Sequence, residues 1–204
     1  MLTSLAAGIA LGLSLIVAIG AQNTYLLQQG LLRRYVAPIV AVCIASDVVL
    51  IACGVAGLGA VVADRPMLPA LAKWGGVAVL TGYGLRAAWS ATRAGTLEPA
   101  AVRGAAGPAA AVGTALALTW LNPHVYLDTV LLLGTAATRY GAYRWWFGAG
   151  AALSSLLWFT ALGFGAGRLA GVLRRPGAWR LINGVIAVTI LLLAVRLATM
   201  PLGR

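Results

Sequence analysis

Long apolar runs separated by short polar breaks dominate the pattern of this chain. A membrane-spanning helix needs about 20 mostly apolar residues, and the runs reach that length without the alternation of apolar and polar positions that is typical of barrel strands. The pattern predicts about six helices by this length rule. Their expected ranges are 4–22, 37–63, 68–88, 111–133, 145–173 and 179–199. The predicted fold class is therefore all-α, a polytopic membrane protein whose first run is a membrane helix and not a removed leader.

The polar breaks also suggest two related halves within one transmembrane domain, 1–204. A shift of 108 positions aligns several small and polar residues of the second and fifth runs. The aligned pairs are Ser46 with Ser154, Asp47 with Ser155, Gly57 with Gly165 and Gly59 with Gly167. With three helices in each half, the second half would cross the membrane in the opposite sense, as is usual in secondary transporters. We interpret the chain as two inverted three-helix repeats, about 1–90 and 111–204, joined by a linker at about 91–110.

Composition supports the membrane class and narrows the partners. Hydrophobic residues make up 61% of the chain and charged residues only 9%, too few charges to cover the surface of a soluble protein. A net charge of +11 raises the possibility of a nucleic-acid partner. The basic residues are instead spread over the ends of the apolar runs, so we predict contact with membrane lipid and no nucleic acid. The face with more arginines is expected to be cytoplasmic, which favours both termini outside.

Two acidic side chains stand inside apolar runs. The chain has four acidic residues, of which Asp64 and Glu98 lie beside prolines in polar breaks. Asp47 and Asp128 lie where a charge is costly, and such residues usually face a cavity, a counter-ion or a substrate. We predict that both bind substrate or protons. A structural salt bridge from Asp47 to Arg86 of the next helix is the alternative.

The first run ends in a glycine followed by carboxamides. Gly20 permits a local break of the helix, and Gln22 and Asn23 offer several hydrogen-bond donors and acceptors at membrane depth. Broken helices of this kind bind substrates in transporters. We predict a hinge at Gly20 and substrate contacts from both amides. A polar helix end at the membrane interface remains the alternative.

The fourth run contains a proline in its middle. Pro123 cannot donate to the carbonyl of Thr119, so we expect a break with that carbonyl free and with Asn122 available to a ligand. His124 and Asp128 stand four residues apart, so on a helix they share a face and can form a proton-relay pair. An ordinary proline kink and an interfacial histidine are the alternatives.

The remaining inventory argues against cofactor chemistry. Cys43 and Cys53 are separated by about 15 Å along one predicted helix, too far for a disulfide, and no zinc pattern occurs. With one histidine and no thiol pair in reach, an intramembrane enzyme or redox carrier is excluded. We predict no enzyme activity, no metal and no cofactor.

These residues occur in an order that resembles the LysE/ArgO family of basic amino-acid exporters. The likeness runs from about Gly8 to Ala198, and the TWLNPHVYLDT stretch is its most specific part. The motifs are Gly20-Ala21-Gln22-Asn23, Gln29-Gly30-x-x-Arg33-Arg34, Ser46-Asp47-x-x-Leu50-Ile51-x-x-Gly54, Lys73-Trp74-Gly75-Gly76 with Gly82-Tyr83-Gly84, and Thr119-Trp120-Leu121-Asn122-Pro123-His124-Val125-Tyr126-Leu127-Asp128-Thr129.

The resemblance implies a secondary exporter of L-lysine or L-arginine in the bacterial inner membrane, driven by protons or another coupling ion. It also implies an inverted-repeat fold and a homo-oligomer, with a dimer as our expectation. By motif match, the residues with implied functions are Asp47, Asn122, Pro123, His124 and Asp128.

Two other substrates remain open because a fold does not fix what a transporter carries. The chain could export another amino acid, neutral and of the homoserine or threonine type, or a metal cation. Two intramembrane carboxylates favour a cationic substrate but do not separate arginine from a metal ion. The absence of a clustered set of His, Cys and Asp argues against a soft metal.

Overall fold

The computed structural model describes residues 1–17, 20–57, 67–92, 107–169 and 176–199. No strand occurs in these ranges, which confirms the all-α class. The helices are α1 (Leu2–Ile16), α2 (Ala21–Leu32), α3 (Val36–Val55), α5 (Met67–Thr92), α6 (Pro108–Trp120), α7 (Pro123–Val125), the π-helix η1 (Tyr126–Leu132), α8 (Leu133–Thr138), the 3₁₀ turn η2 (Gly141–Tyr143), α9 (Arg144–Leu169) and α10 (Pro176–Thr199). Asp64, Glu98 and most of the expected linker lie outside the described residues.

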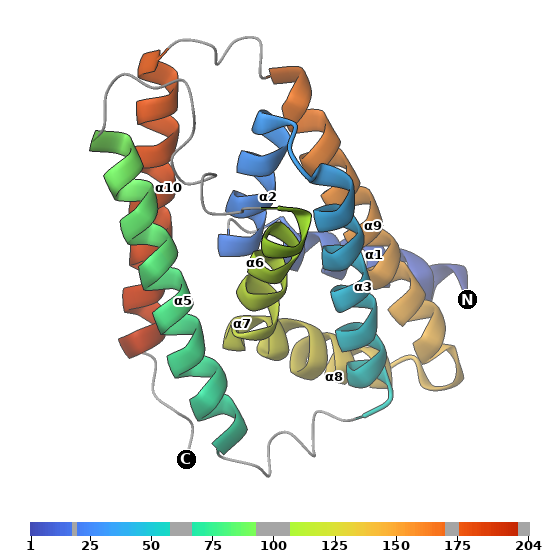
Figure 1. Cartoon of the computed structure of the whole chain (residues 1–204). Helices are drawn as coiled ribbons and strands as arrows, with labels where there is room; N and C mark the ends of the chain where they lie inside the picture. Colours follow the sequence, from blue (N-terminus) through green and yellow to red (C-terminus); the bar gives the residue numbers. More distant parts are fainter. Residues whose placement is uncertain (18–19, 58–66, 93–106, 170–175, 200–204) are drawn as a thin grey trace.

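Helix α9 is the element on which the N-terminal helices assemble. It packs against α1, α2 and α3, and α3 in turn contacts α6, η1 and α8. Helices α5 and α10 lie side by side and run in opposite directions, while α7, η1 and α8 cross the lower end of the molecule (Figure 1). The first and second predicted halves are therefore interleaved and do not form two separate bundles.

Glycines allow α1 and α9 to approach closely. A methyl group on Gly8 would collide with the carbonyl oxygen of Phe147, and one on Gly150 would collide with the carbonyl oxygen of Leu5. Small residues at such crossings are the usual means of packing helices in lipid, where the hydrophobic effect does not drive helices together. The same contact brings Gly12 against Ser154, next to the site described below.

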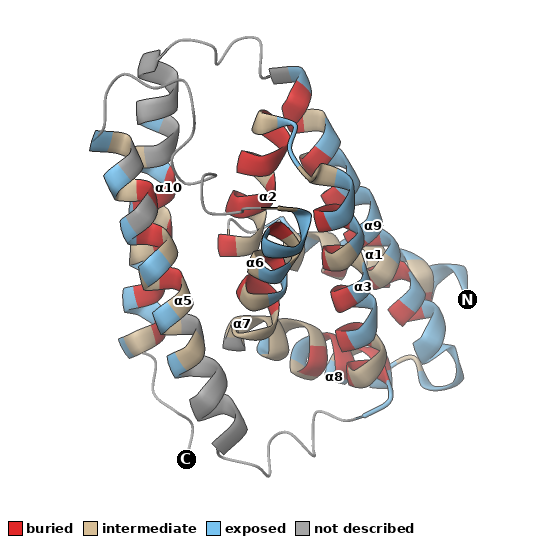
Figure 2. Cartoon of the chain, viewed as in Figure 1, coloured by how far each residue is buried: buried red, intermediate tan, exposed pale blue. Residues whose placement is uncertain are grey.

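The buried and exposed faces of the helices are both apolar. A core of buried residues joins α2, α3, α5, α6, α9 and α10, and the exposed positions lie on the outer faces (Figure 2). Large apolar side chains are prominent there: Leu2 is 82% exposed, Leu192 64% and Val195 61%. An apolar outer surface of this extent is suited to contact with lipid, in agreement with the membrane class.

Two stretches of the described residues, Val36–Val55 and Gly141–Arg168, are helical, long and apolar enough to cross a membrane. The pair α1 and α2 also passes if taken as one span, although it is bent by 81°. The expected ranges 4–22 and 111–133 are each divided in the structure, between α1 and α2 and between α6 and α7, next to Gly20 and Pro123 where breaks were expected. A total of six spans stays a prediction.

Candidate functional site

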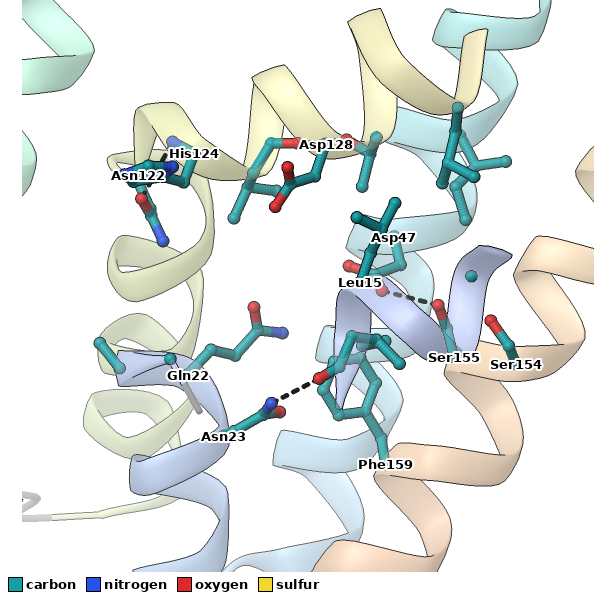
Figure 3. Close-up of a pocket in the computed structure, with 18 of the residues that line it drawn as sticks. Leu15, Gln22, Asn23, Asp47, Asn122, His124, Asp128, Ser154, Ser155 and Phe159 are labelled. Carbon is teal, nitrogen blue, oxygen red and sulfur yellow. Dashed lines mark hydrogen bonds between the residues drawn. The ribbon is translucent and has the colours of Figure 1, made fainter. Parts of the chain in front are cut away.

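One cavity of about 240 Å³ collects polar residues from both halves of the chain. Its walls are formed by α1 and α2, α3, the segment from Asn122 to η1, α9 and α10. Figure 3 shows side chains from several of these elements pointing into one space. The sequence-predicted residues that line it are Gly20, Gln22, Asn23, Asp47, Asn122, His124 and Asp128. The side chain of Pro123 lies outside the description.

Asp47 lies on the cavity wall formed by α3 and α9. Its side chain is 5% exposed, and it accepts a hydrogen bond of 2.7 Å from the hydroxyl of Ser155 on α9 (Figure 3). The residue therefore faces the protein interior and not lipid. The side chain of Arg86, the salt-bridge partner considered for it, is outside the described side chains.

Sequence reasoning missed the role of Ser155. Its hydroxyl is the hydrogen-bond donor that supports the buried carboxylate, because an ionised carboxylate in a dry site needs compensating donors. The 108-residue shift already placed Asp47 on Ser155, and the bond between them has that same separation in sequence. The alignment of the two residues in the sequence therefore contained a usable signal for this contact.

The first break in the chain separates α1 from α2. Helix α1 ends at Ile16, and Gly20 is the extended N-cap of α2, with φ −113° and ψ 174°. The Gln22 side chain extends from the start of α2 into the cavity (Figure 3). Its amide nitrogen is buried and has no hydrogen-bond partner among the described residues. A buried donor of this kind is costly when unsatisfied, so it is a candidate ligand contact.

Asn23 also lines the cavity, but its amide is engaged with the protein. Its Nδ2 donates to the carbonyl of Ile16 at 2.6 Å, and its Oδ1 accepts from Trp158 Nε1 at 3.2 Å. These bonds tie the end of α1 and the start of α2 to α9. Trp158 therefore has a polar role beside its packing, because its indole N–H holds Asn23.

The second break follows α6. The expectation of a free Thr119 carbonyl is wrong, because the N–H of Asn122 reaches it at 3.3 Å and closes the last turn more tightly. The Asn122 side-chain oxygen accepts from the backbone N–H of His124 at 3.1 Å. Trp120 donates through Nε1 to Ser46 at 3.0 Å. These contacts fix the break against α3, beside Asp47.

Asp128 lies on the π-helix η1 and points into the cavity (Figure 3). The Asp128 side chain is half-buried, and we expected it to form a proton-relay pair with His124. No hydrogen bond joins these two side chains among those of the described residues. The wider turn of a π-helix, with i to i+5 bonds, changes the register that places residues four apart on one face. Both side chains line the cavity and lie near enough to interact electrostatically, so their action as a proton-relay pair stays a prediction.

Among the described residues, the charged side chains that line the cavity are two carboxylates and one guanidinium. Arg196 of α10 joins Asp47 and Asp128 in the lining, and the sequence analysis had not singled it out. The described part of the chain contains no group of three or more His, Cys, Asp or Glu side chains placed to hold a metal. Cys43 and Cys53 are both free thiols. The arrangement is suited to binding a small charged molecule by hydrogen bonds and ion pairs.

Comparison with known proteins gives a consistent family. Residues 13–201 match the LysE type translocator family. A putative amino-acid transporter of Mycobacterium tuberculosis is 46% identical over 186 residues, 90% of each chain. The lysine exporter LysE of Corynebacterium diphtheriae is 39% identical over 220 residues, 94% of this chain and 96% of that one. The arginine exporter protein ArgO of Yersinia enterocolitica is 38% identical over 204 residues, the full length of both. No solved structure matches this one.

Proposed function

The chain belongs to the LysE type translocators, and from that premise we propose that it exports L-lysine or L-arginine across the bacterial inner membrane. The names of its relatives, a lysine exporter and an arginine exporter, support this substrate class. The observation that carries the proposal is the cavity in which Asp47 and Asp128 meet polar groups from both chain breaks. Two carboxylates that stand within apolar segments and line one cavity favour a substrate with positive charge.

The cavity offers separate groups for the two ends of a basic amino acid. The carboxylates of Asp47 and Asp128 suit the ammonium and side-chain cations, and the unpartnered amide of Gln22 suits the substrate carboxylate. An extended arginine is roughly 10 Å long between its charged ends, so groups on different walls are needed to hold both. His124 and Asn122, which lie beside Asp128 in the lining, complete the polar half of the site.

We further propose that export exchanges one proton for one substrate cation. Moving a cation out against a negative-inside potential of 100 mV costs about 2.3 kcal/mol, and electroneutral exchange removes this cost. Asp47 has a hydroxyl donor and lines the cavity, so its carboxylate can hold either a proton or a substrate cation. Alternate occupancy by the two would couple their movements.

Efflux from proteoliposomes tests the substrate. Purified protein is reconstituted, and vesicles are loaded with labelled arginine, lysine or threonine. We expect efflux of arginine or lysine well above that of protein-free vesicles, and little efflux of threonine. Preferential release of threonine would instead support the neutral amino-acid alternative. Release of neither basic amino acid, by protein shown to be correctly inserted, would contradict the proposal.

Imposed gradients test the coupling in the same vesicles. Electroneutral exchange predicts that efflux responds to a pH gradient and changes little when a potassium diffusion potential is set with valinomycin. A rate that follows the potential and ignores the pH gradient would exclude proton exchange. Protein-free vesicles under each gradient provide the leak control.

The hydrogen bond between Asp47 and Ser155 supports the proposal of two inverted repeats, since these positions correspond under the 108-residue shift. In this arrangement the cavity lies at the repeat interface, where secondary transporters bind their substrates. Disulfide trapping or topology mapping with reporter fusions would establish the number and direction of the spans. The dimer implied by the family resemblance stays a prediction.

A further inference from the structure

Arg196 is placed on the face of α10 that borders the substrate cavity. Leu193, three residues before Arg196, and Leu197, one residue after it, also line the cavity. These spacings put the three side chains on one side of the helix. Leu197 is 1% exposed, whereas Arg196 is exposed. Arg196 therefore lies where the cavity wall meets the exposed surface, with its apolar neighbour packed inward.

The set of charges in the cavity is complementary to a cationic amino acid. At neutral pH such a substrate carries an ammonium group, a side-chain cation and one carboxylate, while the lining supplies two carboxylates, Asp47 and Asp128, and one guanidinium. We propose that Arg196 binds the substrate's α-carboxylate. This inference rests on the proposed function and adds a specificity-determining residue to the same site. It predicts recognition of amino acids and rejection of the amines that lack the carboxylate.

The chemistry of the available donors favours Arg196 for this role. A guanidinium presents a planar fork that matches a carboxylate with two parallel hydrogen bonds, stronger than those from a neutral amide. Among the described side chains, none forms an ion pair with Arg196. Gln22 provides a second donor. Its amide nitrogen is buried and has no strong hydrogen-bond acceptor among the described residues, since only the weakly accepting thiol of Cys43 lies beside it.

Two amines test this role because each differs from a proposed substrate by the carboxylate alone. Agmatine is arginine without its carboxylate, and cadaverine stands in the same relation to lysine. Binding is measured on the purified full-length chain in detergent, from the rise of the unfolding temperature with ligand concentration, since a ligand that binds the folded state stabilises it. The seven tryptophans provide the fluorescence signal.

The variants separate recognition from stability. Arg196→Gln should weaken arginine binding by about tenfold to a hundredfold, the range expected for hydrogen bonds to a charged group, and leave agmatine binding unchanged. Arg196→Lys keeps the charge without the fork and should retain part of the preference. Arg168→Gln is the matched control, because Arg168 is also an exposed arginine in the last turn of its helix and does not line the cavity.

The expected result is a preference for arginine over agmatine in the unmodified protein and in Arg168→Gln, with nearly equal binding of both by Arg196→Gln. Unchanged agmatine binding by Arg196→Gln shows that the variant is folded. Equal loss of arginine and agmatine binding in Arg196→Gln, or an intact preference for arginine in that variant, would overturn the role of Arg196. In either case, arginine binding by the unmodified protein would leave the proposed function standing. Absence of lysine and arginine binding by the unmodified protein would overturn both proposals.

Discussion

The two carboxylates of the cavity are held in contrasting ways. Asp47 lies in the regular helix α3, is 5% exposed and accepts a hydrogen bond from Ser155. Asp128 lies in the π-helix η1, is only half-buried, and follows a break in the chain. A π-helical turn is uncommon and often marks a functional position. The comparison indicates one carboxylate held in place by a hydrogen bond to a neighbouring helix, and a second carboxylate that is more open to the cavity and for which no such bond is seen among the described residues.

Substitution of Asp47 is the most direct test of this difference between the two carboxylates. Asp47→Asn keeps the size of the side chain and removes its charge, so we expect loss of arginine efflux by roughly thirtyfold or more, from the ~2 kcal/mol lower limit for disrupting a buried charge pair. Expression should change little because the amide can still bond to Ser155. Initial efflux rates from proteoliposomes, normalised to inserted protein, give the measurement. Normal efflux by this variant would return Asp47 to a structural role.

Asp128→Asn makes the same chemical change at the carboxylate that is less buried. We expect a smaller loss than at Asp47, about tenfold, in keeping with a charge-assisted hydrogen bond made in a partly solvated position. The same efflux assay applies, and His124→Gln in parallel reports whether the neighbouring ring contributes. A loss equal to or larger than that of Asp47→Asn would contradict the ranking of the two carboxylates.

Ser155→Ala removes the donor that supports Asp47 and leaves both carboxylates in place. Loss of a hydrogen bond to a charged group typically costs about 1.5–3 kcal/mol, and we expect a reduction of efflux by up to about tenfold because water in the cavity can replace part of the bond. Ser155→Thr keeps the hydroxyl and is the control. In the double variant with Asp47→Asn, the effects should not add, since residues in contact are coupled.

Trp158→Phe should have the smallest effect, since it removes only the bond to Asn23. We expect a decrease of about 1 kcal/mol in the free energy of unfolding, seen as a modest fall in the unfolding temperature, with efflux largely retained. Trp146→Phe, at an exposed position of the same helix, is the control. A fall in efflux as large as that of Ser155→Ala would show that the position of Asn23 is more critical than the geometry indicates.

Much of the site could be predicted from local sequence signals. A charge in an apolar run, a glycine before two carboxamides and a proline within a helix pattern each carry their own physical reason. The aspartates, the glycine, the carboxamides and the two residues that flank the proline line one cavity. Ser155 and Arg196 could not be found in this way, because a serine in a helix and an arginine near a helix end are common and acquire a role only from tertiary contacts. The π-helix at Tyr126–Leu132 likewise has no periodic pattern that distinguishes it from an α-helix.

The hydrogen bonds of Asn23 affect how easily the helices around it can move. Its two hydrogen bonds fasten the end of α1 and the start of α2 to α9, and glycine contacts press α1 against α9 along its length. Moving the end of α1 and the start of α2 away from α9 would break both hydrogen bonds and would also separate the closely packed backbones of α1 and α9. The pair α5 and α10 is held by other contacts, because Tyr83 of α5 donates a hydrogen bond to Gln28 of α2 and packs edge-on against Tyr25. We therefore expect the corner formed by α1, α2 and the adjoining part of α9 to be a stiff frame for the cavity.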